Sequence, residues 1–351
     1  MITPFGGWDS PWARDAGEVT RPSNQSAVGE CESQPTCQTL CVNAEQPHLM
    51  LLDTASLYYR SFFGIPEKVQ APDGTPVNPV RGLLDSISLL VSQYRPDQLV
   101  CCWDNDWRPK WRVELIPSYK QHRVADSSTG GDAEREEAPA SLEAQVPIIL
   151  EVLEAIGIPV VGVDGFEADD VIGSLSSAAT GPVNIVTGDR DLFQLADDAR
   201  CVQVLYTGKG VGKHEVITSA EIHARYGVTA AQYVDFAVLR GDPSDGLPGV
   251  KGIGDKTAAR LLNEYGSLNA VQAAASDPES SLTANQRAQL NRAESYLANA
   301  PRVVRVTRDL AIPKQDLRLV TRPRDPQSVA QISQRWGLDS PVQRLLGTLA
   351  N

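Results

Sequence analysis

Residues 158–191 read I-P-V-V-G-V-D-G-F-E-A-D-D-V-I-G-S-L-S-S-A-A-T-G-P-V-N-I-V-T-G-D-R-D. The apolar runs at 158–163 and 183–187 have the length and the β-branched content of buried strands. The sequence between them, from Glu167 onward, predicts a helix that begins with acidic residues. A strand, a helix and a further strand in this order predict a parallel pair of strands joined by a crossover helix.

The same alternation is present upstream of this stretch. Short apolar runs end at Asp53 (L-M-L-L-D) and at Asp104 (L-V-C-C-W-D), and residues 80–94 between them have helical periodicity. A further helix is expected from about Ser141 to Ile156. The chain from 48 to 215 is therefore predicted to be an α/β domain, with a mainly parallel sheet flanked by helices on both faces.

The sequence pattern changes downstream of residue 215. Around 230–265 it predicts a helix, a Gly- and Pro-rich loop and a second helix, and helical periodicity continues toward the C-terminus. We therefore predict a C-terminal helical domain over residues 216–345. Residues 1–47 contain six acidic and two basic residues without apolar periodicity, which predicts a disordered acidic tail.

The length of 351 residues and the hydrophobic content of 42% give room for two folded domains. No apolar run reaches the ~18–20 residues of a membrane helix, and no basic cluster followed by an apolar stretch marks a secretory signal. Six scattered cysteines do not suggest a disulfide framework. These features favour a soluble, cytoplasmic protein.

The formal net charge of −12 argues at first against a nucleic-acid partner. However, the tail and the stretch 126–137 each carry a net charge of −4. Positive charge is clustered elsewhere, because residues 108–123 carry five bases against one acid and residues 301–324 carry seven bases against two acids. This clustering leaves a polyanionic partner open.

Acidic residues recur just past the carboxyl ends of the predicted strands, where open α/β sheets place their sites. Carboxylates gathered in one cleft repel each other, and divalent cations such as Mg²⁺ or Mn²⁺ remove that cost. Any one of these acids alone is explained equally well as a solvated loop residue or a helix cap, but their recurrence predicts a metal site. The candidate ligands are Asp53, Asp104, Glu167, Asp169, Asp170, Asp189, Asp191 and, before the loop of the second domain, Asp242 and Asp245.

A second motif, G-V-K-G-I-G, begins at Gly249 between two helical patterns. Its glycines, which include Gly252 and Gly254, let the backbone approach a phosphate, and the following helix offers free N–H groups. The motif predicts a helix–hairpin–helix that holds duplex phosphates without reading bases, with Lys251 and Lys256 as side-chain contacts. A Gly-rich turn between helices without DNA is the alternative interpretation.

The stretch T-G-K-G-V-G-K-H at 207–214 is similar to a nucleotide-binding loop but departs from its pattern. It lacks the first glycine of that pattern and the Ser or Thr after Lys213, so we expect a hairpin turn. Cys101 and Cys102 are expected to be core residues of a strand.

Five motifs, in one order, carry a family resemblance. They are L-L-D-T-A-S-L-Y-Y-R (51–60), W-D-N-D-W-R-P-K-W-R-V-E-L-I-P-S-Y-K-Q-H-R (103–123), D-G-F-E-A-D-D-V-I-G (164–173), T-G-D-R-D-L-F-Q-L (187–195) and G-D-P-S-D-G-L-P-G-V-K-G-I-G-D-K-T-A (241–258). Over about 48–310 the chain resembles the bacterial and phage 5′→3′ exonuclease and flap endonuclease family, which includes the 5′-nuclease domain of bacterial DNA polymerase I.

The resemblance implies a PIN-like nuclease core in which two or more Mg²⁺ or Mn²⁺ ions hydrolyse a phosphodiester near the 5′ end of a branched or nicked duplex. All nine acidic positions of the family are filled, which argues for an active enzyme. The resemblance places the following acids around the first ion, directly or through water: Asp53, Asp104, Glu167, Asp169, Asp170 and Asp189. It assigns to the second ion Asp191, Asp242 and Asp245.

The resemblance also makes residues 108–145 a helical arch over the active site. Lys120 and Arg123 would share a face if the segment is helical, and they would grip the scissile phosphate as catalytic residues. The further DNA contacts that the resemblance implies are two phosphate-binding guanidinium groups and a ring that stacks on an unpaired base: Arg60, Arg112 and Tyr119.

Two departures from the family accompany the resemblance. The resemblance would place the acidic stretch 126–137 in the arch, where single-stranded DNA passes in relatives. Gly246 stands where the family has Asn, so we expect a slightly looser loop there. In the glycine-rich loop, relatives also hold a K⁺ ion on backbone carbonyls.

The implied function is a stand-alone, structure-specific 5′ nuclease of replication and repair that acts on DNA or RNA-primed DNA. We expect a nucleoid-associated monomer, with any DNA polymerase as a separate partner. A catalytically inactive branched-DNA-binding module and a ribonuclease of related fold are the alternatives. Residues 1–41 are expected to be dispensable, with Val42 as an alternative start.

Overall fold

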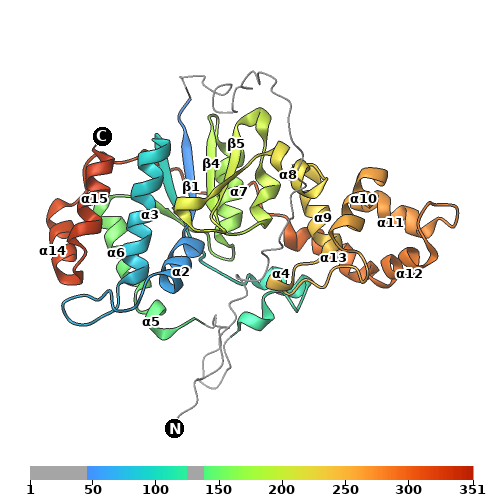
Figure 1. Ribbon diagram of the computed structural model, residues 1–351, viewed down its shortest axis with the longest axis horizontal. Coiled ribbons are helices and arrows are strands. Elements are labelled where there is room, and N and C mark those ends of the chain that lie inside the picture. Colours follow the sequence, from blue (N-terminus) through green and yellow to red (C-terminus); the bar gives the residue numbers. More distant parts are fainter. Residues whose placement is uncertain (1–45, 125–137, 351) are drawn as a thin grey trace, which may run out of the picture. The chain divides into compact units, whose positions relative to one another are not determined.

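The computed structural model describes residues 46–124 and 138–350 (Figure 1). The predictions of a disordered tail and of an acidic insertion at 126–137 lie outside the described residues, apart from Gln46 and Pro47.

A six-stranded sheet with the order β3-β2-β1-β4-β5-β6 forms the centre of the described chain (Figure 1). The strands are β1 (Leu49–Asp53), β2 (Gln98–Cys102), β3 (Val160–Val161), β4 (Val183–Thr187), β5 (Val202–Tyr206) and β6 (Glu215–Ile217). The first five pair in parallel, and β6 runs antiparallel to β5. The prediction of a mainly parallel α/β sheet is confirmed, and the sequence pattern had not indicated β5 and β6.

The central strands β1 and β4 are buried along their whole length and mostly apolar, because helices cover both faces of the sheet. Alternate residues of β1 enter different cores, as the two-residue repeat of a strand requires, with Leu51 on one side and Leu52 on the other. Cys101 and Cys102 are buried in β2, as predicted. The first core contains α7 (Ala168–Ala178), and the second contains the helices α2 (Thr54–Gly64), α3 (Asn78–Tyr94) and α6 (Val146–Ile156).

Shorter helical elements connect the sheet to the site and build the C-terminal region. Before α6 lie α4 (Lys110–Leu115), η2 (Gln121–Arg123) and α5 (Ala140–Glu143), and after β4 and β5 lie η3 (Asp191–Leu195), η4 (Asp198–Arg200) and η5 (Val211–Lys213). The C-terminal region contains α8 (Ser219–Tyr226), η6 (Ala230–Gln232), α9 (Tyr233–Arg240), η7 (Pro243–Asp245), α10 (Asp255–Tyr265), α11 (Leu268–Ser276), α12 (Ala284–Arg292), α13 (Glu294–Val304), α14 (Pro326–Trp336) and α15 (Asp339–Leu349).

The last two helices return to the sheet domain. α14 packs against α6 and α15 packs against α3, and their buried residues Val329 and Leu345 join the core around Leu52. The sheet also extends to Ile217, past the boundary expected at residue 215. The structure therefore places the end of the predicted helical domain on the α/β core, because α14 and α15 have apolar sides that only this core covers.

Residues 305–325 link α13 to α14 and carry most of the basic run predicted at 301–324. Leu99 in β2 donates its backbone N–H to Leu317 O at 3.0 Å, and Leu319 donates to Asp97 O at 2.8 Å. All seven bases of the run are exposed. Because the link passes the amino end of β2, its basic side chains from Lys314 onward lie away from the edge where the strands end.

No helix of the described residues combines the length and the apolar character that crossing a membrane requires.

Candidate active site

The first two predicted acids lie where neighbouring strands end. Asp53 closes β1 and caps α2, and its carboxylate accepts hydrogen bonds from Ser56 N (3.2 Å) and Thr187 Oγ1 (2.7 Å). Asp104 follows β2 and accepts from Ala168 N at 2.8 Å. Burial raises the pKa of Asp53 above its usual range, and the nearby charge of Asp104 raises it further. The parallel sheet therefore brings these two carboxylates together, as predicted.

The acids after β4 extend the same cluster. Burial raises the pKa of Asp189 to about 6, and the charges of Asp245 and Asp242 contribute. Burial also raises the pKa of Asp191, again with Asp189 as a neighbour. The buried Oδ1 of Asp191 accepts no hydrogen bond from any described residue.

Asp169 connects the two groups of acids. Burial raises its pKa well above the usual value, and Asp189 and Asp53 add to the shift in that order. Since such mutual effects require proximity, the strand-end acids and the two acids of η7 form one field of negative charge.

This field fits a bound cation by its donor chemistry. Buried carboxylates that repel each other, and an Asp191 oxygen without a hydrogen bond from the described residues, are features that a divalent ion would relieve. All the donors are hard oxygens of the kind that Mg²⁺ and Mn²⁺ prefer. Within residues 46–124 and 138–350, no three acidic, histidine or cysteine side chains form a finished ligand set. The donors are therefore present, while their side chains are not arranged in a closed coordination shell.

Two of the predicted metal ligands have cationic partners instead. The guanidinium of Arg112 contacts Glu167 Oε2 and lies 2.8 Å from Asp170 Oδ1. Lys120 Nζ pairs with Glu167 Oε1, and the hydroxyl of Tyr119 donates to Glu167 Oε2 at 2.8 Å. Both carboxylate oxygens of Glu167 are thus bonded, and in this structure Glu167 and Asp170 hold the basic segment in place. Their role as metal ligands, directly or through water, stays a prediction.

The same contacts bury two of the predicted DNA contacts. Arg112 is only 2% exposed and Tyr119 only 4% exposed. Neither side chain is open to a phosphate or a base, because each is enclosed between α4, α7 and the turn before Lys120. In this structure the guanidinium of Arg112 and the hydroxyl of Tyr119 contact the acid motif, and their role in DNA binding stays a prediction.

The basic segment is not the single helix that the spacing of Lys120 and Arg123 suggested. α4 ends at Leu115, and Lys120 has φ +48°, a left-handed conformation that is uncommon for a residue with a side chain. Its backbone N–H donates to Asp245 O at 2.9 Å. Arg123 in η2 donates to Ser244 O (2.7 Å) and lies 2.9 Å from Asp245 Oδ1. The two residues therefore reach different parts of the acidic field.

The charge of Lys120 is secure in this setting. Burial is the largest single effect and lowers the pKa of its ammonium group, but the combined effect of its neighbours, Tyr119 and Asp245 first among them, leaves the net pKa above its usual value. A fixed positive charge consequently stands beside the acid cluster.

The loop that carries Asp242 and Asp245 packs tightly against the basic segment. Asp242 accepts from Ser244 N at 2.9 Å, and its backbone exchanges two hydrogen bonds with Leu247 (3.0 and 2.8 Å). Gly246 has φ +70°, and a Cβ there would lie 2.0 Å from Ser118 O. The expectation of a looser loop at Gly246 was therefore wrong, because glycine allows this close approach.

The glycine-rich motif lies between α9 and α10, which is the predicted helix–loop–helix arrangement. Gly249 and Gly252 have positive φ, and Gly254 caps α10. Two apolar side chains, Val250 and Ile253, are buried and anchor the loop. The remaining predicted contacts are exposed: Lys251 and Lys256.

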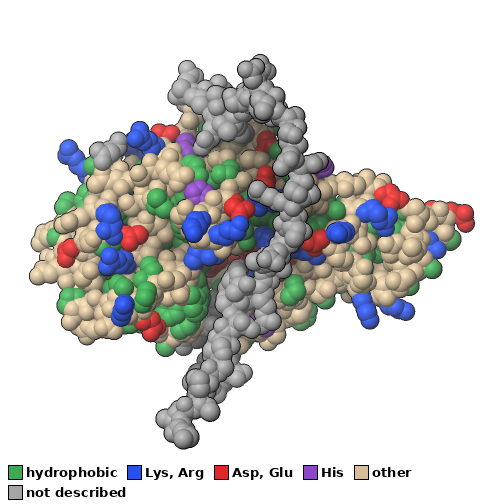
Figure 2. All heavy atoms as spheres, in the orientation of Figure 1, with side chains coloured by type: hydrophobic (Ala, Val, Ile, Leu, Met, Phe, Trp, Pro, Cys, Tyr) green, Lys and Arg blue, Asp and Glu red, His purple; other side chains and the backbone are tan. Residues whose placement is uncertain are grey.

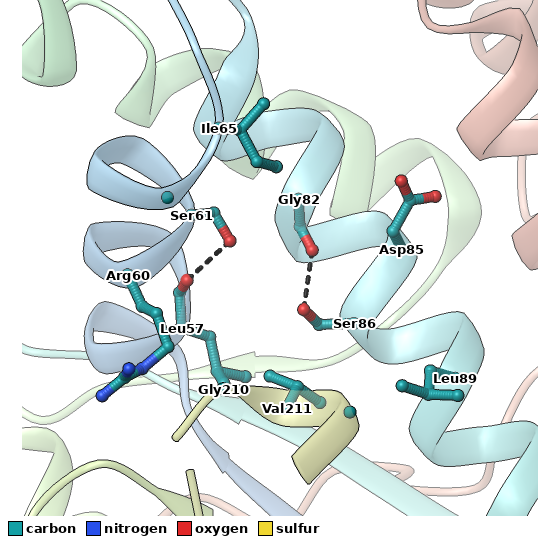
Figure 3. Close-up of a pocket in the computed structure, with 12 residues that line it drawn as sticks. Leu57, Arg60, Ser61, Ile65, Gly82, Asp85, Ser86, Leu89, Gly210 and Val211 are labelled. Atoms are coloured by element: carbon teal, nitrogen blue, oxygen red, sulfur yellow. Dashed lines mark hydrogen bonds between the residues drawn. The ribbon is translucent and has the colours of Figure 1, made fainter. Parts of the chain in front are cut away.

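Arg60 lies on α2, apart from the other cationic residues. Its Nη1 donates to Gly208 O at 3.2 Å, and its buried Nε has no partner among the described residues. The side chain lines a pocket of about 320 Å³ between α2, α3 and the residues around η5 (Figure 3). The stretch 207–214 connects antiparallel β5 and β6, so the predicted hairpin is confirmed.

Sequence reasoning missed one buried residue beside the acids. Gln194 is 4% exposed, and its Nε2 donates to Asp191 O (2.9 Å) and Val304 O (3.0 Å). Its Oε1 accepts from Val306 N at 3.1 Å. The sequence feature that could have indicated it is the single amide side chain in the otherwise apolar run L-F-Q-L (192–195).

Two family models together match residues 48–327 of this chain. A family model described as 5′-3′ exonuclease, N-terminal resolvase-like domain, matches residues 48–227, and one described as 5′-3′ exonuclease, C-terminal SAM fold, matches residues 228–327. A 5′-3′ exonuclease of Streptomyces coelicolor is 58% identical over 300 residues, which cover 86% of this chain and 99% of the relative. One from Mycobacterium tuberculosis is 48% identical over 307 residues, covering 85% and 96%.

A solved structure shows the same fold at low identity. The flap endonuclease D15 of bacteriophage T5, in a pseudo-enzyme-product complex with DNA and metal ions, covers 87% of this chain and 100% of its own. The TM-score is 0.55 and the identity is 18%.

Proposed function

The chain belongs to the 5′-3′ exonuclease family, and from this premise we propose a metal-dependent, structure-specific 5′ nuclease that hydrolyses phosphodiesters near the 5′ end of branched or nicked duplex DNA. The observation that carries the proposal is the field of buried carboxylates beside the cationic Lys120 and Arg123. Carboxylates that a cation would stabilise and cationic side chains that can bind a phosphate meet at one edge of the sheet. A phosphodiester with divalent ions satisfies both.

Seven acids would hold the divalent ions in this proposal. A bound ion of this kind lowers the pKa of a water molecule and offsets charge on the leaving oxygen. The seven are the candidate acids that Arg112 does not contact: Asp53, Asp104, Asp169, Asp189, Asp191, Asp242 and Asp245. Mg²⁺ or Mn²⁺ is the ion proposed.

Lys120 and Arg123 would bind the scissile phosphate and stabilise the negative charge that develops on it. Both side chains already form ion pairs with carboxylates, Lys120 with Glu167 and Arg123 with Asp245. A phosphate competes with these carboxylates as a partner of the same charge type. The pairs therefore keep the two cations near the acid cluster until substrate arrives.

The loop between α9 and α10 would hold the duplex through its backbone. Positive-φ glycines and the free N–H groups at the start of α10 form a phosphate-binding surface, and the exposed Lys251 and Lys256 add charge. A K⁺ ion on the loop carbonyls belongs to the same proposal, as does a phosphate contact from the half-buried Arg60. We further propose that the protein acts as a monomer alongside a separate DNA polymerase.

Asp189→Ala tests the proposal. We expect 5′-flap cleavage with Mg²⁺ or Mn²⁺ to fall about 10²–10³-fold, the loss typical when one electrostatic stabiliser of a transition state is removed. Flap binding, measured by fluorescence anisotropy with Ca²⁺, should persist. Asp277→Ala is the matched control, since Asp277 is exposed in the loop after α11.

Two results would decide for the alternatives. Wild-type protein that binds flaps but cuts nothing with either ion would be a branched-DNA-binding module. Wild-type protein that prefers single-stranded RNA to flapped DNA would be a ribonuclease.

A further inference from the structure

A short segment after α13 runs across both acid motifs. Residues 304–310 leave the helical region and pass α7 and η3, the elements that carry Asp170 and Asp191. α13 is itself tied to α9, since the hydroxyl of Tyr296 donates to Val238 O at 3.0 Å. α9 leads directly into the loop proposed to hold the duplex. The segment 304–310 is therefore a covalent and hydrogen-bonded link between the duplex-binding loop and the acids.

Gln194 holds one side of this link. Its side-chain amide bonds Val304 O and Val306 N on the segment, and at the same time Asp191 O in the acid motif. The carbonyl of Gln194 also accepts from Arg308 Nη2 at 2.8 Å. One buried side chain thus joins the segment to the backbone of a proposed metal-binding residue.

Asp170 and Ser174 hold the other side. Asp170 Oδ1 accepts from Thr307 N at 2.7 Å while the same atom meets Arg112. Ser174 Oγ bonds Thr307 O at 3.2 Å and accepts from Leu310 N at 3.1 Å. The segment is thus hydrogen-bonded on both sides, with donors and acceptors satisfied in a buried setting.

Gly173 shows how close this approach is. A Cβ at this position would lie 2.5 Å from Thr307 O and 2.9 Å from a methyl group of Val306. A glycine in the middle of a helix is destabilising relative to alanine. In α7 the glycine allows the segment to lie directly on the helix.

We propose that Asp170, Ser174 and Gln194 form a clamp that fixes the register between the duplex-binding loop and the acid cluster, and so determines which phosphodiester is cut. The inference rests on the proposed nuclease function. Apolar packing between the regions, such as Phe193 against Tyr233 (ring centroids 5.6 Å apart), is non-directional and tolerates small shifts. Hydrogen bonds at fixed atoms do not tolerate them. The apolar contacts hold the regions together. The bonds from Lys120 and Arg123 to residues 244–245 align the loop with the basic segment, and the clamp aligns it with α7 and η3.

Gln194→Met tests the clamp, because methionine keeps the shape of the side chain without its hydrogen bonds. The matched control is Gln232→Met, since Gln232 Nε2 bridges two carbonyls at 3.0 Å, Leu262 O and Gly266 O, entirely within the helical region. Products of a 5′-flap substrate are mapped at single-nucleotide resolution under single-turnover conditions. Backbone hydrogen exchange at Val306 and Thr307 is measured on the same proteins.

For Gln194→Met we expect products at neighbouring phosphodiesters to increase about three- to tenfold relative to the main product, the factor that corresponds to losing one or two hydrogen bonds. Exchange at Val306 should become faster, while Gln232→Met keeps the wild-type product pattern. If Gln194→Met does not fold, Ser174→Ala takes its place.

An unchanged product pattern in the folded variant would overturn the proposal, whether or not exchange at Val306 rises. Failure of the nuclease function is separate, because it would appear as absent cleavage by the wild-type protein. In that case unchanged exchange at Val306 in Gln194→Met would reject the clamp by itself.

Discussion

At the scale of one residue, Asp189 illustrates why ionised carboxylates are unfavourable in this site. Its carboxylate is buried and faces Asp245 and Asp242, and its pKa rises to about 6 for these reasons. It keeps one hydrogen bond that favours the charged form, from Asp191 N at 2.8 Å. The residue is therefore destabilised when ionised in the metal-free protein, and a divalent cation reverses that effect.

This arrangement predicts a pH-dependent stability. Because the pKa of Asp189 is raised in the folded protein, its contribution to stability is fully present below the unfolded pKa of 3.8 and is lost as pH rises through about 6. The loss amounts to roughly 3 kcal/mol by the linkage relation. Urea unfolding in EDTA between pH 4 and pH 7 should show wild-type stability falling relative to Asp189→Asn.

Added Mg²⁺ should remove this difference between the two proteins at pH 7. Parallel pH profiles for the wild type and Asp189→Asn in EDTA would contradict the interpretation.

At the scale of elements, α4 and α7 are joined by one buried guanidinium. Arg112 connects the basic segment to Glu167 and Asp170, and through Asp170 to Thr307. The partners lie 55 and 58 residues away from Arg112 in sequence. Since both acids of the pair belong to the start of α7, the geometry of the basic segment follows that of the acid motif.

Arg112→Met should therefore destabilise the protein by about 3–5 kcal/mol, because it leaves the buried carboxylate of Asp170 without its cation and Glu167 with Lys120 alone. The measurement is urea unfolding at pH 7 with EDTA. Lys110→Met is the matched control, since Lys110 is exposed and lies 3.9 Å from Glu114, a kind of pair worth about 0–1 kcal/mol. Equal effects of the two substitutions would refute the structural role of Arg112.

At the scale of the molecule, the surface is not uniformly negative. Figure 2 shows Lys and Arg side chains interspersed with Asp and Glu on the visible face. Nine acids gather at the ends of the strands and in η7, and the exposed Lys251 and Lys256 lie on the loop before α10 and at its start. The net charge of −12 is thus compatible with binding a polyanion at a particular surface.

The double variant Lys251→Ala/Lys256→Ala should weaken duplex binding and lower the slope of log K against log salt by about 2, one unit for each phosphate that a lysine no longer neutralises. Binding is measured with Ca²⁺ at several KCl concentrations. Lys314→Ala is the control, because Lys314 is exposed on the link that passes the amino end of β2. A slope unchanged in the double variant would exclude the loop as the duplex-binding surface.

The amino-acid sequence alone was enough to predict the fold class, the edge of the sheet that carries the site and the helix–loop–helix. These predictions follow from the local sequence, since apolar runs of strand length indicate the strands and the carboxyl ends of parallel strands lie at the same edge of a sheet. The packed structure was needed to show that Arg112 and Tyr119 are buried, that Glu167 and Asp170 bind cations, and that Gln194 joins α13 to the acids. Those outcomes depend on partners 47 to 137 residues apart, as in Lys120–Glu167 and Asp170–Thr307. Periodicity carries no information about such pairs, because burial and hydrogen bonding between distant segments are fixed only when the segments pack.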